Sequence, residues 1–327
     1  MEESRAHRGI RMPATANSNA HNAQRPTYPA ILEFSRFIGR KTPALRGKNF
    51  VIRDCLARLN HKLPTDATVT SLDGLSFAHC DINQYIYREL CVYGVWEPDV
   101  VWIYNHILQP GDTVIDIGAC FGFHALRAAK LVGDGGRVIA FEPQPDIHAN
   151  LLENVRINQF TNIEADCCAF NATGESVALH RFSDRDVGTT SISKMNHEEF
   201  ETIHCLAFTL DGFIADRDLT RIDLIKLDVE GAELGVLQGA TQLLSSARPP
   251  MWVLEINEET AHNCGYHPRD LLKLLTTKGY VFYRPAWGNI VRRVKGLERC
   301  DEGRHGDNLL CIRPDVHGDR LREAGIR

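Results

Sequence analysis

From Gly111 onward, short apolar runs alternate with longer segments whose apolar residues recur every three or four positions. The short runs predict buried strands, and the spacing of Ile147, Leu151 and Val155 is that of one helix face. Strands that alternate with helices indicate parallel β-α-β units with right-handed crossovers. The pattern therefore predicts an α/β fold with a doubly wound, mostly parallel sheet. We expect seven strands, at 113–117, 137–141, 163–169, 222–227, 252–256, 280–283 and 308–312, the last two forming a hairpin.

The pattern before Gly111 is different and predicts an N-terminal extension over residues 31–110. Its first part favours one or two amphipathic helices, and Asp73-Gly74 between two β-prone runs is a hairpin signal. Residues 81–108 are helical in pattern, with a break near Gly94 and Pro98. The first thirty residues are polar, lack periodicity and are predicted to be disordered. The expected organisation is a tail (1–30), the extension (31–110), an α/β domain (111–315) and a C-terminal tail (316–327).

Composition narrows the class of protein. The chain has 327 residues, of which 43% are hydrophobic and 24% charged, as in soluble globular proteins. A net charge of -5 argues against a nucleic-acid partner. The sequence shows neither a signal-peptide pattern nor an apolar run long enough to span a membrane. The ten cysteines follow no zinc or paired spacing, which favours a reducing, cytoplasmic setting.

A glycine-containing loop follows the first strand of the α/β domain. Asp116, Gly118 and Gly122 join that strand to the next helix, where ligands bind in open α/β sheets. Glu142 follows the second strand, and its carboxylate can accept hydrogen bonds from ribose hydroxyls. The dinucleotide fingerprint is absent, and the acids favour a cationic ligand without phosphates, such as S-adenosylmethionine (SAM). The alternative is a structural turn with a helix-capping glutamate. The remaining expected cofactor-binding residues are Ala119, Phe121, Pro143 and Asp166.

Three ionisable residues end the fourth strand. Alternation along a strand places Lys226, Asp228 and Glu230 on one face, pointing at the ligand crevice. Methyl transfer to a hydroxyl requires a group that takes the hydroxyl proton, so these three are the candidate catalytic residues. The alternative is a structural Lys–Asp pair with Glu230 as a helix cap.

Acceptor-binding residues are expected on the neighbouring strand and in the segment 171–210. Glu255 and Asn257 end the fifth strand, and Ser191 lies between two extra β-prone runs, 177–182 and 204–209. With Asp228, the first two could also offer oxygen ligands to Mg²⁺. An acidic strand end that receives substrate hydroxyls is the other interpretation. The histidines follow no metal pattern.

Taken in order, these motifs resemble the FkbM family of SAM-dependent methyltransferases. The resemblance covers residues 81–314 and is strongest at 222–233. The Cys120-Phe121 pair departs from the smaller or polar residues usual in the family's glycine loop. The other matching segments are Tyr93-Gly94-Val-Trp-Glu97-Pro98, 111–119, Phe141-Glu142-Pro143, Asn154, Asn158, Thr209-Leu-Asp211 and 237–240.

The resemblance implies a class I methyltransferase core and O-methylation of a sugar or natural-product hydroxyl. It would place Asp116, Gly118, Gly122 and Glu142 at the cofactor and Asp228 with Glu230 beside the methyl group. The expected partners are a small hydroxylated acceptor and, for oligomerisation, a second copy of the chain. Two other functions remain open from the sequence: a nicotinamide-dependent oxidoreductase and a non-catalytic SAM-binding protein.

Overall fold

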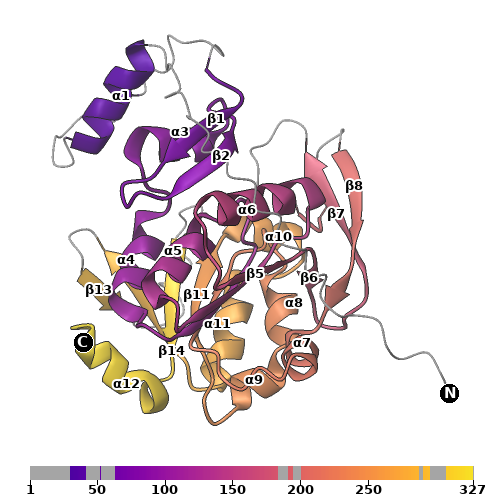
Figure 1. Cartoon of the computed structure of the whole chain (residues 1–327). Helices are drawn as coiled ribbons and strands as arrows, with labels where there is room; N and C mark the ends of the chain where they lie inside the picture. Colours follow the sequence, from indigo (N-terminus) through magenta and orange to yellow (C-terminus); the bar gives the residue numbers. More distant parts are fainter. Residues whose placement is uncertain are drawn as a thin grey trace.

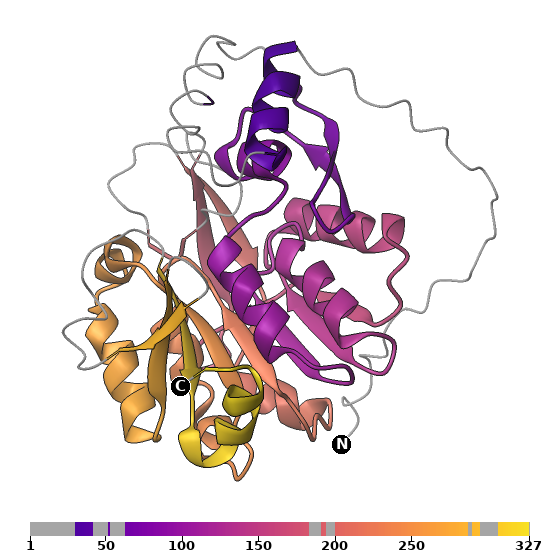
Figure 2. The same cartoon turned by 90° about the vertical axis from the view of Figure 1, so that its left-hand side faces the viewer.

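The computed structural model describes residues 30–41, 52, 63–182, 191–193, 200–286, 290–294 and 307–326. Within these ranges, helices cover both faces of an eight-stranded sheet, and the part of the N-terminal extension before Gly94 stands at one end of the molecule (Figures 1 and 2). Of the predicted tail (1–30), residues 1–29 lie outside the described residues, as do residues 183–190 and 194–199.

The sheet has the doubly wound, mostly parallel order that the sequence predicts. From one edge to the other the order is β5-β4-β3-β10-β11-β14-β12-β13. The first five of these strands are parallel, whereas β14 is antiparallel to both neighbours. All seven predicted strands are present, and β13 adds an eighth at the edge. The bounds are β3 (Thr113–Ile117), β4 (Arg137–Phe141), β5 (Ile163–Asp166), β10 (Leu224–Leu227), β11 (Met251–Ile256), β12 (Val281–Ala286), β13 (Ile290–Arg293) and β14 (Asp307–Ile312).

Alternation along the strands gives each face its own core. Val114 and Val253 pack with the helices α4 (Pro98–Ile107), α5 (Phe123–Val132) and α6 (Pro145–Ile157). Ile115 and Leu254 point the other way, toward α7 (Leu210–Asp216), α8 (Glu233–Gln238) and α11 (Pro268–Thr277). The chain leaves β3 in one direction and returns to β10 on its other side. The carboxyl ends of β3 and β10 therefore flank the switch point at which such sheets bind ligands.

Two segments differ from the prediction. The helix expected over 231–244 is two short helices, α8 and α9 (Thr241–Ser245), because the backbone turns at Gly239, where a Cβ would lie 2.3 Å from the carbonyl oxygen of Asn171. The prediction of a C-terminal tail from residue 316 was wrong. Residues Pro314–Glu323 form helix α12, and Leu321 and Ile326 are buried in the core.

The N-terminal extension contains the predicted hairpin and the predicted helix break. Strands β1 (Ala67–Thr70) and β2 (Ser76–Cys80) pair antiparallel around Asp73-Gly74. Helix α3 (Tyr85–Tyr93) ends at Gly94 in the left-handed conformation, and Pro98 starts α4. One of the expected amphipathic helices is α1 (Ala30–Lys41), which packs on α3. The rest of the segment before Leu63, apart from residue 52, lies outside the described residues.

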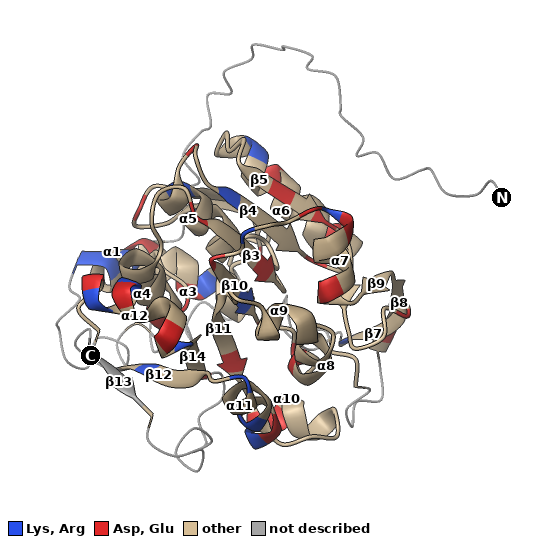
Figure 3. Cartoon of the chain, turned by 90° about the horizontal axis from the view of Figure 1, so that it is seen from below, with Lys and Arg blue, Asp and Glu red and all other residues tan. Residues whose placement is uncertain are grey.

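A second hairpin stands at the rim of the sheet. Strands β7 (Val177–Phe182) and β8 (Phe200–Cys205) pair antiparallel, and the short β6 (Ala169–Phe170) and β9 (Ala207–Phe208) pair beside them. The two β-prone runs of 171–210 are thus strands. In the view of Figure 3, acidic and basic residues are interspersed over the outer helices. None of the described helices is long and apolar enough to cross a bilayer.

Candidate active site

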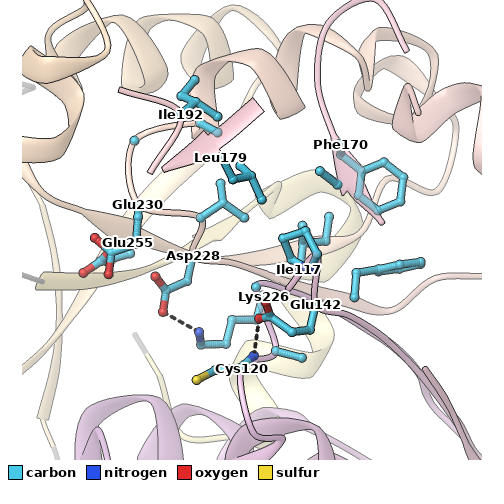
Figure 4. Close-up of a pocket in the computed structure, with 18 of the residues that line it drawn as sticks. Ile117, Cys120, Glu142, Phe170, Leu179, Ile192, Lys226, Asp228, Glu230 and Glu255 are labelled. Carbon is cyan, nitrogen blue, oxygen red and sulfur yellow. Dashed lines mark hydrogen bonds and ion pairs between the residues drawn. The ribbon is translucent and has the colours of Figure 1, made fainter. Parts of the chain in front are cut away.

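A cavity of about 790 Å³ opens at the carboxyl ends of β3, β4, β10 and β11. Its volume is in the range of pockets that hold small molecules. Figure 4 shows the side chains that line it and the two contacts, Lys226 with Asp228 and Glu142 with Cys120, that organise its floor. Ten of the predicted site residues line it: Gly118, Ala119, Phe121, Glu142, Pro143, Lys226, Asp228, Glu230, Glu255 and Asn257.

The glycine loop is held tightly between two strands. The backbone N–H groups of Gly118 and Ala119 both donate to the carbonyl oxygen of Phe141, at 3.0 and 2.9 Å. Gly118 has φ +85°, and a Cβ there would lie 1.7 Å from the carbonyl oxygen of Asp228. Only glycine permits this approach. At Gly122 a Cβ would strike the side chains of Leu151 and Leu126, so this glycine serves helix packing rather than lining the cavity.

Glu142 is fixed at the wall of the cavity. One carboxylate oxygen accepts the N–H of Cys120 at 3.0 Å and the other accepts that of Gln144 at 2.9 Å. Burial raises the pKa of Glu142 to about 7, although these hydrogen bonds act in the opposite direction. Each oxygen can accept more than one hydrogen bond. The carboxylate therefore keeps capacity for the paired hydroxyls of a ribose.

Lys226 and Asp228 form a buried ion pair at the end of β10. The Nζ of Lys226 donates to Asp228 at 2.7 Å, and the lysine is 2% exposed. Burial lowers the pKa of Lys226, but the carboxylates of Asp228, Glu97 and Asp116 outweigh this and hold it well above its ordinary value. Lys226 therefore remains charged and cannot take a proton from an acceptor. Its charge fixes the position of Asp228 at the cavity.

Glu97 and His124 also line the cavity, and sequence reasoning gave them no role. The Nε2 of His124 lies 2.7 Å from Glu97, and Asn308 donates to the other carboxylate oxygen at 3.1 Å. Burial raises the pKa of Glu97, but Lys226 and His124 outweigh it and hold this pKa at about 2. A sequence signal for Glu97 did exist, because the segment 93–98 is one of the segments that resemble the FkbM family.

Four predicted site residues lie outside the cavity lining. Asp116 is 1% exposed, both its oxygens lack a hydrogen-bond partner, and burial raises its pKa. Asp166 is engaged by Arg217 at 2.8 Å. Ser191 is buried behind the wall, where its hydroxyl donates to the carbonyl oxygen of Glu230 at 3.0 Å. Gly122 is the fourth.

The residues considered for Mg²⁺ do not form a suitable set. The side-chain oxygen of Asn257 accepts the N–H groups of Glu259 and Thr260 at the start of α10 (Glu258–Asn263), and Asp228 is held by Lys226. Among the described residues, no group of three or more His, Cys, Asp or Glu side chains could hold a metal ion. The donor set thus gives the magnesium hypothesis no support.

The acidic side chains in and beside the cavity suit SAM, which is positively charged at sulfur. A buried carboxylate stands beside the glycine loop, and further acids face the space next to it, while Asp116 below adds two unpartnered oxygens. An excess of carboxylates stabilises a positively charged ligand and opposes a pyrophosphate. The strand order, the loop and this site together define a class I SAM-dependent methyltransferase.

Comparison with known proteins gives the family. Residues 116–282 match the methyltransferase FkbM domain, and the chain belongs to this family. It is 27% identical over 180 residues to the hexuronic acid methyltransferase AglP of Haloferax volcanii, covering 55% of this chain and 68% of that protein. It is 25% identical over 227 residues to methyltransferase sdnD of Sordaria araneosa, covering 60% and 82%. Among solved structures, it is similar to a SAM-dependent O-methyltransferase from Thermotoga maritima, with 14% identity, a TM-score of 0.37 and coverage of 78% and 80%.

Proposed function

We propose that this methyltransferase acts on a hydroxyl oxygen of a small molecule, a sugar, glycoconjugate or natural product. The observation that carries the proposal is the row of carboxylates on the cavity wall immediately beside the glycine loop. Such groups accept hydrogen bonds from hydroxyls and can take a hydroxyl proton. The name of the relative AglP, a hexuronic acid methyltransferase, is in keeping with this substrate class.

The cofactor half of the cavity would be formed by the glycine loop and Glu142. When bound, SAM supplies a methyl group on a positively charged sulfur. Glu142 would receive the ribose hydroxyls, and Gly118 lets the backbone approach the ligand. Asp116 would contribute negative charge from below the loop. Asp166, being paired with Arg217, would act only by holding the end of β5.

The acceptor half would lie toward Asp228, Glu230, Glu255 and Asn257. Asp228, fixed by Lys226, would orient the acceptor hydroxyl. Ser191 would act indirectly, because its hydroxyl holds the backbone at Glu230. Tyr85 and Trp96 also line the cavity, with their rings 5.8 Å apart and nearly perpendicular, and they would offer an acceptor an apolar surface with polar tips.

The test is transfer from SAM to a panel of hydroxylated acceptors that includes uronic acids, followed by mass spectrometry. Asp228→Asn should lower turnover about 100-fold or more, a loss typical of a charged group at a reacting centre, while cofactor affinity changes much less. Asp134→Asn, on an exposed loop, is the matched control. Binding of SAM without transfer to any acceptor would contradict the proposed activity.

We also expect a chelator to leave turnover unchanged, because Asp228 is engaged by Lys226 and the side-chain oxygen of Asn257 by backbone N–H groups. Loss of activity in EDTA that Mg²⁺ restores would overturn this expectation. The proposed cellular setting is the cytoplasm, supported by the free thiols of the eight described cysteines that the structure gives as unpaired. Self-association stays a prediction that the molar mass in solution would check.

A further inference from the structure

Glu255 is one of the acidic side chains that line the cavity, together with Glu97, Glu142, Asp228 and Glu230. Its strand β11 pairs with β10 up to Leu227 and Leu254, so Glu255 lies directly beyond that pair and beside Asp228. On its other side it is opposite Asn308 of β14. It lines the cavity, and Figure 4 shows it next to Glu230 and Asp228. An acceptor hydroxyl bound between these strands would meet this carboxyl group.

Among the described acids that line the cavity, Glu255 is the one with a buried oxygen that lacks a hydrogen-bond partner. Asp228 is engaged by Lys226, Glu97 by His124 and Asn308, and Glu142 by two backbone N–H groups. The Oε2 of Glu255 is buried and has no hydrogen-bond partner. A buried polar atom without a partner is costly and in native proteins commonly marks a functional position.

The charged groups around Glu255 are mainly carboxylates and therefore negative. Asp228 faces it from β10, Glu230 and Glu233 from the following loop and α8, and Glu97 from the start of α4. The positive charge of Lys226 is engaged by Asp228, and Asn308 on β14 is neutral. Burial and these carboxylates raise the pKa of Glu255 well above its ordinary value. The carboxyl group therefore holds a proton more readily than an exposed glutamate does.

We infer that Glu255 is the general base of the reaction and that it gives up its own proton to solvent when the sulfonium cofactor binds. This inference rests on the proposed function. In the transfer step the acceptor oxygen bonds to the methyl carbon, the carbon–sulfur bond breaks with its electron pair remaining on sulfur, and the hydroxyl proton moves to Oε2 of Glu255. The product thioether is neutral at sulfur, so Glu255 keeps that proton and the resting state is restored.

The physical reason is the charge of the sulfonium. A positive charge nearby favours the ionised form of a carboxyl group. SAM carries this charge, whereas S-adenosylhomocysteine (SAH) carries the same nucleoside and amino-acid groups without it. Any proton released by Glu142 on binding the ribose is common to both ligands. The difference between SAM and SAH therefore isolates the response to the sulfonium.

The experiment is calorimetric titration of the full chain with SAM and with SAH in buffers of different ionisation enthalpy. Wild-type protein should release more protons with SAM than with SAH, the excess approaching one proton per site at a pH below the pKa of Glu255 in the free protein and above its pKa in the SAM complex. Glu255→Gln should abolish the excess and lower turnover about 10²- to 10⁴-fold, as loss of a general base does. Glu258→Gln, on the exposed first turn of α10, should leave the excess unchanged.

An equal proton count for SAM and SAH in the wild-type protein would overturn the inference, whether or not Glu255→Gln folds. Persistence of the excess in Glu255→Gln would assign it to another acid and equally overturn it. Failure to bind either ligand would overturn the proposed function, and the role of Glu255 with it. If SAM and SAH both bind normally but release equal numbers of protons, the proposed methyltransferase activity is unaffected and only the role of Glu255 as general base is excluded.

Discussion

At the scale of single residues, Gly118 decides whether the site can form. Its φ is in the left-handed region, and the carbonyl oxygen of Asp228 occupies the space where a side chain would start. Gly74 has nearly the same φ, +89°, but nothing lies within 4 Å of its Cβ position. Substituting each glycine by alanine therefore separates two free-energy costs, that of a side chain at positive φ and that of its contact with Asp228.

We expect Gly118→Ala to lower the free energy of unfolding by about 2–5 kcal/mol, the sum of the conformational and overpacking costs. Gly74→Ala should cost only about 1–2 kcal/mol, the conformational part. Urea denaturation of both variants measures these two changes in the free energy of unfolding. Equal losses would mean that the contact with Asp228 does not constrain residue 118.

The elevated pKa of Glu142 predicts a pH-dependent affinity for the nucleoside. Burial raises this pKa to about 7. The ionised carboxylate accepts hydrogen bonds from ribose hydroxyls better than the protonated acid, so the affinity for SAH should be full above that pH. Below it, the affinity should fall by up to about tenfold per pH unit, because protonation then competes with binding. In Glu142→Gln, titration with SAH should show weaker binding that no longer changes across this range; an unchanged pH profile would exclude Glu142 from the site.

At the scale of elements, the apolar pattern was sufficient for the seven main strands and for most helix boundaries. Buried strands and amphipathic helices are specified by the sequence near each position. The pattern failed where a distant contact decided the outcome. Helix α8 stops at Gly239 because the backbone of Asn171 approaches there. Helix α12 has a mostly polar sequence, and it is held by a buried aspartate that precedes Arg320 of this helix by 208 residues.

That aspartate is Asp112, just before β3. Arg320 of α12 reaches its two oxygens at 2.6 and 2.9 Å, and Arg221 reaches it at 3.1 Å. The side chain of Asp112 is 1% exposed. Asp112→Ala should therefore lower the free energy of unfolding by roughly 2–4 kcal/mol, since a largely buried arginine loses its partner.

Asp319→Ala in the same helix is the control, because its pair with Arg322 is exposed and should be worth less than about 1 kcal/mol. Both values come from denaturant unfolding. A loss for Asp112→Ala no larger than the control would show that α12 does not depend on this contact.

At the scale of the whole molecule, the extension and the cofactor site are coupled through α6. The side-chain oxygen of Asn154 accepts the N–H of Ala78 in β2, and its amide donates to the carbonyl oxygen of Phe121 in the glycine loop, both at 2.8 Å. The ring of Phe121 packs against Phe77 and Tyr87 of the extension, with centroids 5.5 and 4.8 Å apart. The extension therefore supports one wall of the cavity.

Asn154→Ala should lower the free energy of unfolding by about 2–4 kcal/mol, because a buried and a partly buried backbone group lose their partner. It should also weaken SAH binding, since Phe121 is released. Asn105→Ala, at an exposed position, should change stability by no more than about 0.5 kcal/mol. Unfolding curves and calorimetry test both effects. Full SAH affinity in a destabilised Asn154→Ala would show that the extension does not act on the site.

The site itself could be predicted only in part. Strand ends and the glycine loop are local features, so residues such as Glu142 and Asp228 could be assigned from sequence. Glu97 and His124 enter through the packing of α4 and α5, which no local pattern specifies. Asp166 lies in the predicted strand 163–169 and Ser191 between two extra β-prone runs, and their partners in the fold turn them away from the cavity.

We propose that the cavity beside Gly118 binds a sulfonium nucleoside with its ribose at Glu142. Calorimetric titration of the wild-type chain and of Glu142→Ala with SAM, and with NADH for comparison, tests it most directly. We expect SAM to bind, Glu142→Ala to weaken this binding at least about tenfold, as loss of charged hydrogen bonds does, and NADH not to bind. Absence of SAM affinity up to millimolar concentrations, or binding of NADH in its place, would contradict it.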